Sequence, residues 1–503
     1  MIAKAGPREW IGLGVLSLAC VLYAMDLTVL HLAIPKISAD LHPSSSELLW
    51  IMDIYGFFVA GSLITMGNLG DRIGRRKLLL VGAITFAITS VLAAFSTSPQ
   101  MLIIARALLG VSGATLAPST LSLIRNMFHD DKQRSIAIGV WVSCFSAGAA
   151  IGPLVGGALL EYFWWGSVFL LALPVMAVLL VLGPILLPEF KDKNAKRLDP
   201  VSAALSLGTI LAIIYGIKQI AQDGFGFEPI LFVVIGLAIG AAFLARQKRI
   251  TDPLVDLNLF KTRAFGGSLV TFLLGVFVAF GAFVFISQYF QLVLGLSPLQ
   301  AGLWMLPWPL AFVVGSTITP RIAHRIKPGK IIAIGMILAG IGLGLLVQID
   351  ADTSFWLIMA ALVISSLGLA PVFTLATDLV VGSAPPERAG AASAISETTA
   401  ELGGALGIAI LGSIGTALYR KELAESMPAI PNHLQQTSMD TLAGAVQASK
   451  SLPTETGTIL LEAAHKSFLH GLHISMIVGV VLTACAAFLV LVLLKGVKTS
   501  QTH

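Results

Sequence analysis

Residues 67–77, Gly-Asn-Leu-Gly-Asp-Arg-Ile-Gly-Arg-Arg-Lys, join two apolar stretches, 48–69 and 78–96. Each stretch is long enough to cross a bilayer as a helix, because about 20 apolar residues suffice. The glycines favour a tight turn, and the charges of Arg72, Arg75 and Arg76 would be unfavourable in hydrocarbon. The segment therefore predicts a loop at a membrane surface between two spanning helices.

The composition extends this prediction to the whole chain. Of its 503 residues, 56% are apolar and 12% are charged, and the mean hydropathy is +0.89. These values are typical of a polytopic membrane protein surrounded by lipid. We predict an all-α protein with fourteen spans, at residues 10–32, 48–69, 78–96, 101–124, 135–159, 164–187, 199–217, 229–245, 265–291, 299–319, 331–349, 354–381, 389–418 and 468–494.

The distribution of charge predicts the orientation. Most of the 32 Lys and Arg residues lie in loops on one side of these spans, and an excess of cationic loops marks the cytoplasmic side. Both termini are then cytoplasmic. The net charge of +5 faces the anionic leaflet and requires no nucleic-acid partner. Cys20, Cys144 and Cys485 lie in apolar spans without paired spacing, which predicts neither disulfides nor a metal site.

A second loop, Pro-Arg-Ile-Ala-His-Arg-Ile-Lys-Pro-Gly-Lys at 320–330, weakly repeats the first. The repeat predicts a six-helix half at 1–190, an inserted two-helix hairpin at 191–250, and a six-helix half at 251–503 with an outer loop at 419–467. Two similar halves around a cavity are typical of transporters. Small residues that allow close helix contact support the repeat: Gly148, Gly152, Pro153, Gly156 and Gly157 in one half, and Gly403, Gly404 and Gly407 in the other.

Five acidic side chains lie inside apolar spans, namely Asp26, Asp53, Asp378, Glu397 and Glu401. A carboxylate in hydrocarbon costs roughly 2.5 to 3.5 kcal/mol, so such residues usually face a bundle interior or a wet cavity. Asp26 lies past the midplane of its span. It is a candidate for binding both a proton and a cation, or for a structural hydrogen bond to a neighbouring helix.

Glu397 and Glu401 are four residues apart and therefore share one helix face. Because like charges disfavour joint ionisation, at least one is expected to hold a proton near neutral pH; a packing or capping role is the alternative. Asp53 is a candidate for an outer gate or an interfacial structural role. Asp378 is interpreted as a solvated helix end.

These motifs together resemble those of the major facilitator superfamily. Residues 67–77 resemble its cytoplasmic signature, Arg106 with Gly110 and Gly113 resembles its fourth-span signature, and 148–157 resemble its antiporter signature. The segments 25–35, 49–55 and 165–169 are similar to those of its fourteen-span drug:proton antiporters, especially the exporters of quaternary ammonium compounds. This likeness covers nearly the whole chain.

The resemblance implies a proton-coupled exporter of lipophilic cations in a bacterial cytoplasmic membrane, with no cofactor apart from the coupling proton. It implies Glu401 as the proton carrier and favours Asp71, Arg72, Arg75 and Arg76 as a conformational latch, where spacing alone equally allows a cationic turn. Arg106 requires an acceptor or water inside the bundle, unless it extends to the outer interface. We expect a monomer whose partners are small cationic drugs and the lipid bilayer.

Six aromatic residues are candidates for a cavity wall that binds lipophilic cations, although each could equally pack against other helices or lipid: Tyr55, Phe57, Tyr289, Trp308, Phe312 and Phe373. Some members of the resembled family carry an acidic residue that handles divalent cations where Phe312 stands. This departure favours monovalent substrates.

Other functions remain open at this stage. A transporter of a lipid or an anionic metabolite would favour a positively charged cavity, and a membrane sensor or membrane-embedded enzyme would need a signalling domain or a catalytic constellation. In the outer loop, the Ala-rich stretch around 441–448 predicts a short helical hairpin. This hairpin could form a lid or a passive connection.

Overall fold

The computed structural model describes residues 5–43, 45–191, 199–224, 226–250, 253–350, 353–385 and 388–496, and every regular element within them is helical. The N-terminal set comprises α1 (Pro7–Leu41), α2 (Ser45–Ile73), α3 (Arg75–Ala94), α4 (Pro99–Gly113), α5 (Leu116–Met127), α6 (Asp131–Tyr162), α7 (Ser167–Leu170) and α8 (Ala172–Leu186). An inserted pair follows, α9 (Pro200–Asp223) and α10 (Phe227–Gln247).

The C-terminal set begins with a short 3-10 turn, η1 (Leu259–Lys261), and contains one π-helical turn, η2 (Tyr289–Val293). Its α-helices are α11 (Arg263–Gln288), α12 (Pro298–Met305), α13 (Pro307–Ala323), α14 (Pro328–Leu346), α15 (Phe355–Ser383), α16 (Ala389–Ser426), α17 (Asn432–Asp440), α18 (Leu442–Ser449) and α19 (Thr454–Leu493).

Twelve helical segments among the described residues are long and apolar enough to cross a membrane, so this is a multi-pass membrane protein. The helices α2 and α6 are 29 and 32 residues long but are not among those twelve. The count of fourteen spans therefore stays a prediction.

Three of the predicted spans are interrupted, between α4 and α5, between α7 and α8, and between α12 and α13. Proline explains the first and the last of these breaks. Pro118 lacks the N–H that would bond the carbonyl of Ala114, where α4 gives way to α5. Pro307 begins α13, and the preceding residue, Leu306, bonds back to Leu303 in a tighter turn.

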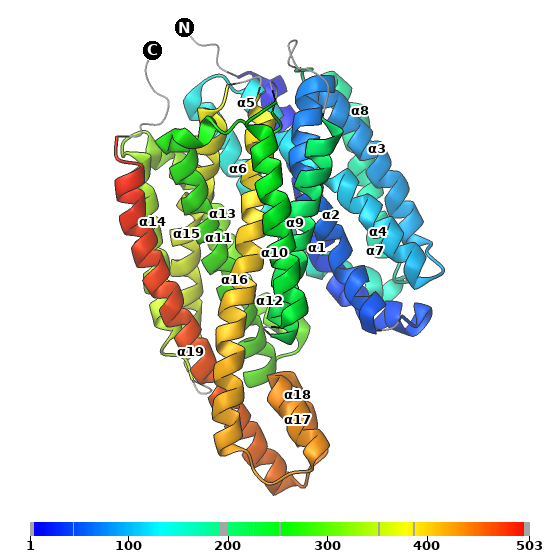
Figure 1. The fold of residues 1–503 in the computed structure, drawn as a ribbon, viewed down its shortest axis with the longest axis vertical. Helices are drawn as coiled ribbons and strands as arrows, with labels where there is room; N and C mark the ends of the chain where they lie inside the picture. The colour runs from blue at the N-terminus through cyan, green and yellow to red at the C-terminus, as the bar shows by residue number, and fades with distance from the viewer. Residues whose placement is uncertain are drawn as a thin grey trace.

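The helices run roughly side by side along the long axis of the molecule (Figure 1). At one end lie the α2–α3, α5–α6 and α13–α14 turns together with the start of α1 and the end of α19. The loops here carry most of the basic residues, and we call it the basic end. The pair α17 and α18 lies at the opposite end (Figure 1).

The two sets repeat one close helix contact. In the N-terminal set α6 packs on α1, and a Cβ on Gly148 would collide with the carbonyl oxygen of Val21. In the C-terminal set α16 packs on α11, and a Cβ on Gly407 would collide with the carbonyl oxygen of Phe277. The predicted close approach at these glycines is therefore present in both sets.

The other residues of the antiporter-like segment also lie in α6. A Cβ on Gly156 would come within 2.7 Å of the side chain of Val29 in α1, so this second glycine serves the same contact. Gly152 is buried. Pro153 lies in the helix, and its side chain is outside the described part of the chain.

The inserted pair forms its own helical hairpin, and α9 also contacts α2 and α16. At the basic end Arg246 donates two hydrogen bonds to Asp199, at 2.7 and 3.1 Å, while Asp199 caps the first turn of α9. These bonds hold the pKa of the Asp199 carboxyl well below its usual range. The segment that follows α10 is tied to α2 through Asn68, whose side chain donates to the carbonyl of Leu254 at 2.8 Å.

The predicted helical hairpin in the outer loop is confirmed as α17 and α18. The loop itself is shorter than predicted, because α16 continues to Ser426 and α19 begins at Thr454. Tyr419 of α16 donates a hydrogen bond to the carbonyl of Ser438 in α17 at 2.7 Å, so the hairpin is fixed to the extended helix.

The glycine contact between α1 and α6 leads to a first prediction. Gly148→Ala should destabilise the protein by about 1 to 3 kcal/mol, because the added methyl must push two helix backbones apart. Thermal unfolding of the detergent-purified protein measures the effect. Gly157→Ala on the same helix is the matched control, since its Cβ would meet nothing within 4 Å. Equal melting temperatures for both variants would contradict the packing argument.

Candidate functional site

Arg106 of α4 occupies the centre of the N-terminal set. It is 1% exposed, so the alternative that it extends to the outer interface is wrong. Its Nε donates to the carbonyl oxygen of Ile51 in α2 at 2.7 Å, and its Nη1 lies 3.7 Å from Oδ2 of Asp26 in α1. The predicted acceptors within the bundle are therefore a backbone carbonyl and a carboxylate.

Two aromatic rings flank the same guanidinium. Its Cζ lies 5.1 Å from the ring centre of Tyr55 in α2 and 5.9 Å from that of Phe169 in α7, distances at which a ring face attracts a cation. Tyr55 is fully buried. It thus contacts the charge of the protein itself, where the sequence had suggested a wall for a substrate.

The acidic pair of the C-terminal set faces this cluster. Glu397 and Glu401 are half-buried on α16 and interact electrostatically with each other and with Tyr23 of α1. Tyr23 is 3% exposed, and its ring centre lies 6.4 Å from that of Tyr55. The structure therefore gathers all three predicted proton-coupling residues, Asp26, Glu397 and Glu401, around two tyrosines. Sequence reasoning missed Tyr23, because a tyrosine in an apolar span has no distinguishing pattern.

A second aromatic group lies between the helices of the C-terminal set. Phe373 of α15 meets Phe272 of α11 and Phe312 of α13 edge to face, each at 5.3 Å between ring centres. Phe312 also belongs to the hydrophobic core that contains the buried residues of the N-terminal set. Trp308 is partly buried and packs against that core. The structure thus places Phe312, Phe373 and Trp308 between the two sets, which is compatible with the predicted substrate contact.

Other predicted residues are not brought to this site. Phe57 packs against Tyr215 of α9, on the face of α2 that meets the inserted pair. Tyr289 is fully buried, and its hydroxyl donates to the carbonyl of Asp350 at 2.8 Å. These contacts account for the burial of both side chains. Asp53 lies within α2, and its side chain is outside the described part.

The predicted latch residues occupy the basic end. Arg75 is fully buried, and its Nε donates to Asp71 Oδ1 at 2.7 Å while a second nitrogen bonds the carbonyl of Gly67. Asp71 Oδ2 accepts the backbone N–H of Ala391, in the first turn of α16, at 3.2 Å. A carboxylate at a helix N-terminus is favourable. The loop therefore joins α2 to α16, which belong to different sets.

The remaining arginines of this loop have other surroundings. Arg76 donates to the carbonyls of Pro184 and Leu187 at 3.1 and 3.0 Å and so satisfies the exposed end of α8. Arg72 lies in the last turn of α2. The loop thus braces its own set as well as contacting the other one.

A second contact between the sets was not predicted. Asp378 of α15 was interpreted as a solvated helix end, and this was wrong: it is 4% exposed. It accepts a hydrogen bond from Ser135 of α6 at 2.5 Å and lies 3.5 Å from Nε of Arg134. Further along the same helix, Ser143 bonds Ser316 of α13 at 2.6 Å. No sequence pattern marks partners more than a hundred residues apart.

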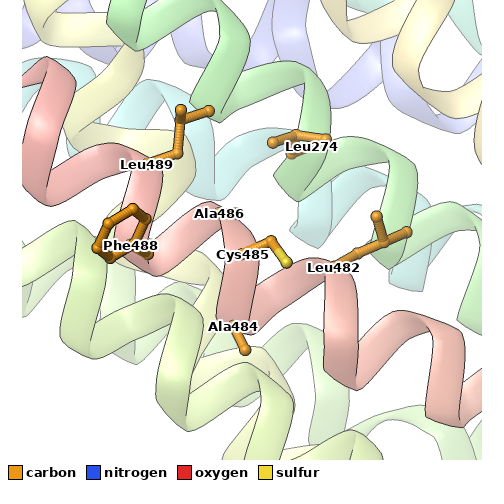
Figure 2. A pocket seen from close by; sticks show the side chains of 7 residues that line it. All are labelled: Leu274, Leu482, Ala484, Cys485, Ala486, Phe488 and Leu489. Carbon is orange, nitrogen blue, oxygen red and sulfur yellow. The ribbon is translucent and has the colours of Figure 1, made fainter.

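The structure also has an apolar depression, formed by Leu274 of α11 and the segment 482–489 of α19 (Figure 2). Its lining includes Cys485 and no charged side chain. It therefore lacks the carboxylate that a cation would require and is distinct from the acidic cluster.

Comparison with known proteins agrees with this arrangement. Residues 16–408 match the family model described as Major Facilitator Superfamily. The chain is 42% identical over 487 residues to the multidrug efflux pump LfrA of Mycolicibacterium smegmatis, covering 97% of this chain and 96% of the relative. It is 33% identical over 463 residues to the methyl viologen resistance protein SmvA of Salmonella typhimurium, covering 92% and 93%.

A solved structure shares the fold. The human organic anion transporter MFSD10 aligns with a TM-score of 0.65 over 96% of this chain and all of its own, at 15% sequence identity. At that identity the likeness supports the helical architecture alone.

The contact at Asp378 yields a second prediction. Asp378→Asn should weaken the contact between the two sets at the basic end, because Arg134 loses its charged partner across the sets. Leaving buried polar groups poorly paired costs on the order of 1 to 3 kcal/mol. A cysteine introduced at Ser143, in a background without the native cysteines, should then react faster with a maleimide.

Asp131→Asn is the matched control, since Asp131 also bonds Arg134, at 2.7 Å, but from within α6. Only the loss of Asp378 breaks a contact between the sets. If both variants accelerate labelling equally, the contact at Asp378 does not hold the two sets together at the basic end.

Proposed function

Because the chain belongs to the Major Facilitator Superfamily, we propose that it exports lipophilic organic cations in exchange for protons. It is a membrane transporter and not an enzyme. The names of LfrA and SmvA, an efflux pump and a resistance protein, support export of toxic compounds. We further propose the bacterial cytoplasmic membrane as its location, with both termini in the cytoplasm.

One observation carries this proposal: three carboxylates, Asp26, Glu397 and Glu401, lie around two buried tyrosines, Tyr23 and Tyr55, and only Asp26 among them is paired with a buried arginine. Carboxylates within a bundle of membrane helices attract cations and accept protons. A site for an anionic substrate would favour an excess of positive charge. The acidic excess therefore favours a cationic substrate over an anionic metabolite.

The proposed mechanism is alternating access between two six-helix halves, 1–190 and 251–503, with the inserted hairpin at 191–250 and fourteen spans in all. With the basic end on the cytoplasmic side, the contacts of Asp71 and Asp378 close the cytoplasmic entrance. This arrangement corresponds to a state that exchanges protons and drug with the outside.

The direction of transport follows from the membrane potential. A proton that enters from outside neutralises a carboxylate, which weakens its attraction for a bound cation and releases it. Loss of the proton to the cytoplasm restores the anionic site. An inward proton supplies about 2.3 kcal/mol per 100 mV, before any pH gradient is counted.

Glu401 provides the test of coupling. Glu401→Gln should abolish proton-driven uptake of ethidium into inverted vesicles, because the amide cannot carry a proton through the cycle. Glu422→Gln, on the same helix, is the control, since Glu422 lies in the outer extension of α16 beside His470. Gradient-driven uptake by Glu401→Gln at the wild-type rate would remove Glu401 as the coupling residue.

Phe312 provides a test of substrate charge. The wild type should export the monovalent ethidium better than the divalent methyl viologen. A dication loses more hydration, and this site has Phe312 where some family members carry an additional carboxylate. Phe312→Asp should raise export of the dication relative to the monocation. Phe272→Asp is a control, because this ring contacts Phe373 from α11 and not from the boundary between the sets. An unchanged ratio in Phe312→Asp would place residue 312 outside the substrate path.

A further inference from the structure

The ion pair at the centre of the N-terminal set is incomplete. The 3.7 Å between Arg106 Nη1 and Asp26 Oδ2 exceeds a hydrogen-bond distance, and this oxygen accepts no hydrogen bond from any described residue. Yet the side chain of Arg106 is buried and that of Asp26 is mostly buried, at 2% and 13% exposed. A guanidinium and a carboxylate in a low-dielectric interior would normally close to a charge-assisted bond, so other contacts must hold Arg106 back.

Among the described residues, those contacts include the backbone carbonyl of Ile51 and the rings of Tyr55 and Phe169. The carbonyl fixes one edge of the guanidinium, and the rings restrict its faces. The Tyr55 hydroxyl has no hydrogen-bond partner among the described residues. The ring, not the hydroxyl, therefore accounts for the interaction of Tyr55 with the cation.

Glycines of α4 fix the position of this ring. Arg106, Gly110 and Gly113 share one helix face. A Cβ on Gly110 would lie 2.5 Å from the carbonyl oxygen of Tyr55, and one on Gly113 would lie 3.0 Å from its hydroxyl. The glycines thus allow Tyr55 to lie directly against α4, beside the guanidinium.

We propose that Tyr55 is a positioning residue whose ring, together with Phe169, holds Arg106 short of contact with Asp26. The carboxylate is thereby left available to a proton or to a cationic substrate. The second part of this statement rests on the proposed function, and the first part does not.

Among the side chains that the structure describes, few other charged or titratable groups face Asp26. Arg106 comes from α4 and Tyr55 from α2, and Tyr23 precedes Asp26 by one turn on α1. From α16, Glu401 interacts electrostatically with both tyrosines, and Glu397 with Tyr23. Cys144 of α6 interacts with Cys20, which lies on α1 farther from Asp26 than Tyr23 does. Among these, only Arg106 is a cation, so a shorter distance between Arg106 and Asp26 would lower the affinity of Asp26 for a proton.

Infrared titration of the purified protein tests the positioning directly. The carbonyl band of protonated Asp26 is identified by its loss in Asp26→Asn. Tyr55→Leu removes the ring, so that Arg106 can close on Asp26 and stabilise the ionised form. The band should then appear at a pH lower by about 1 unit or more than in wild type. Tyr55→Phe keeps the ring and should titrate as wild type.

Two variants separate this effect from lost packing. Phe86→Leu removes another buried ring of the N-terminal set and should lower the melting temperature without moving the band. Phe169→Leu removes the second ring beside Arg106 and should move the band in the same direction as Tyr55→Leu. If Tyr55→Leu does not fold, Phe169→Leu serves as the test in its place. Wild-type titration in a folded Tyr55→Leu or Phe169→Leu variant, or a shifted band in Tyr55→Phe, overturns the proposal.

Binding of ethidium to the same variants relates the positioning to transport. At a pH above the titration, Tyr55→Leu should bind ethidium about tenfold more weakly than wild type, because Arg106 then competes for Asp26. Unchanged binding in Tyr55→Leu would contradict the availability of Asp26 to substrate. Absence of ethidium binding in wild type would instead contradict the proposed function, while the infrared titration would still decide the positioning.

Discussion

A permanently charged guanidinium buried among apolar helices requires compensation from every side, and Arg106 imposes this requirement on the helices around it. α1 supplies a carboxylate, α2 a backbone carbonyl and a ring, and α7 a second ring. None of these helices can separate from α4 without leaving the charge poorly compensated. The N-terminal set is therefore expected to move as a unit when the protein changes conformation.

The groups that can change charge are divided between the two sets. Asp26 belongs to α1, whereas Glu397 and Glu401 belong to α16. The first turn of α16 is also where Asp71 of α2 contacts the C-terminal set. A single continuous helix thus connects the acidic pair with the basic end. A displacement of α16 at the acidic pair must therefore be accommodated at the contact with Asp71, and the reverse.

Much of this arrangement could be predicted from sequence because it depends on local patterns. Apolar length identifies the spans, four-residue spacing places Glu397 and Glu401 on one face, and glycines mark the contact of α6 with α1. The partners of Asp378 and the rings around Arg106 could not be predicted. They depend on how distant helices pack, and a serine at a helix start or a phenylalanine in an apolar span carries no sign of its partner.

The same limit explains why Asp378 was misinterpreted and why the candidate aromatic residues of α2 have different surroundings. Asp378 lies three residues before the predicted end of its span, and a charge at such a position is usually solvated. Its actual surroundings depend on α6, which brings Ser135 and Arg134 to it. Phe57 and Tyr55 are two residues apart, so a helix directs them to different faces, and the inserted pair covers one of those faces.

The energy needed to open the basic end is comparable with the energy that the membrane provides. A typical hydrogen bond contributes about 0.5 to 1.5 kcal/mol net, and one to a charged group about 1.5 to 3. The contacts of Asp71, Asp378 and Ser143 between the sets therefore amount to roughly 3.5 to 7.5 kcal/mol together. One proton crossing 100 mV supplies about 2.3 kcal/mol. Contacts of this size hold one conformation, and the energy of one proton offsets only part of them. Contacts that form in the alternative conformation must therefore offset the remainder.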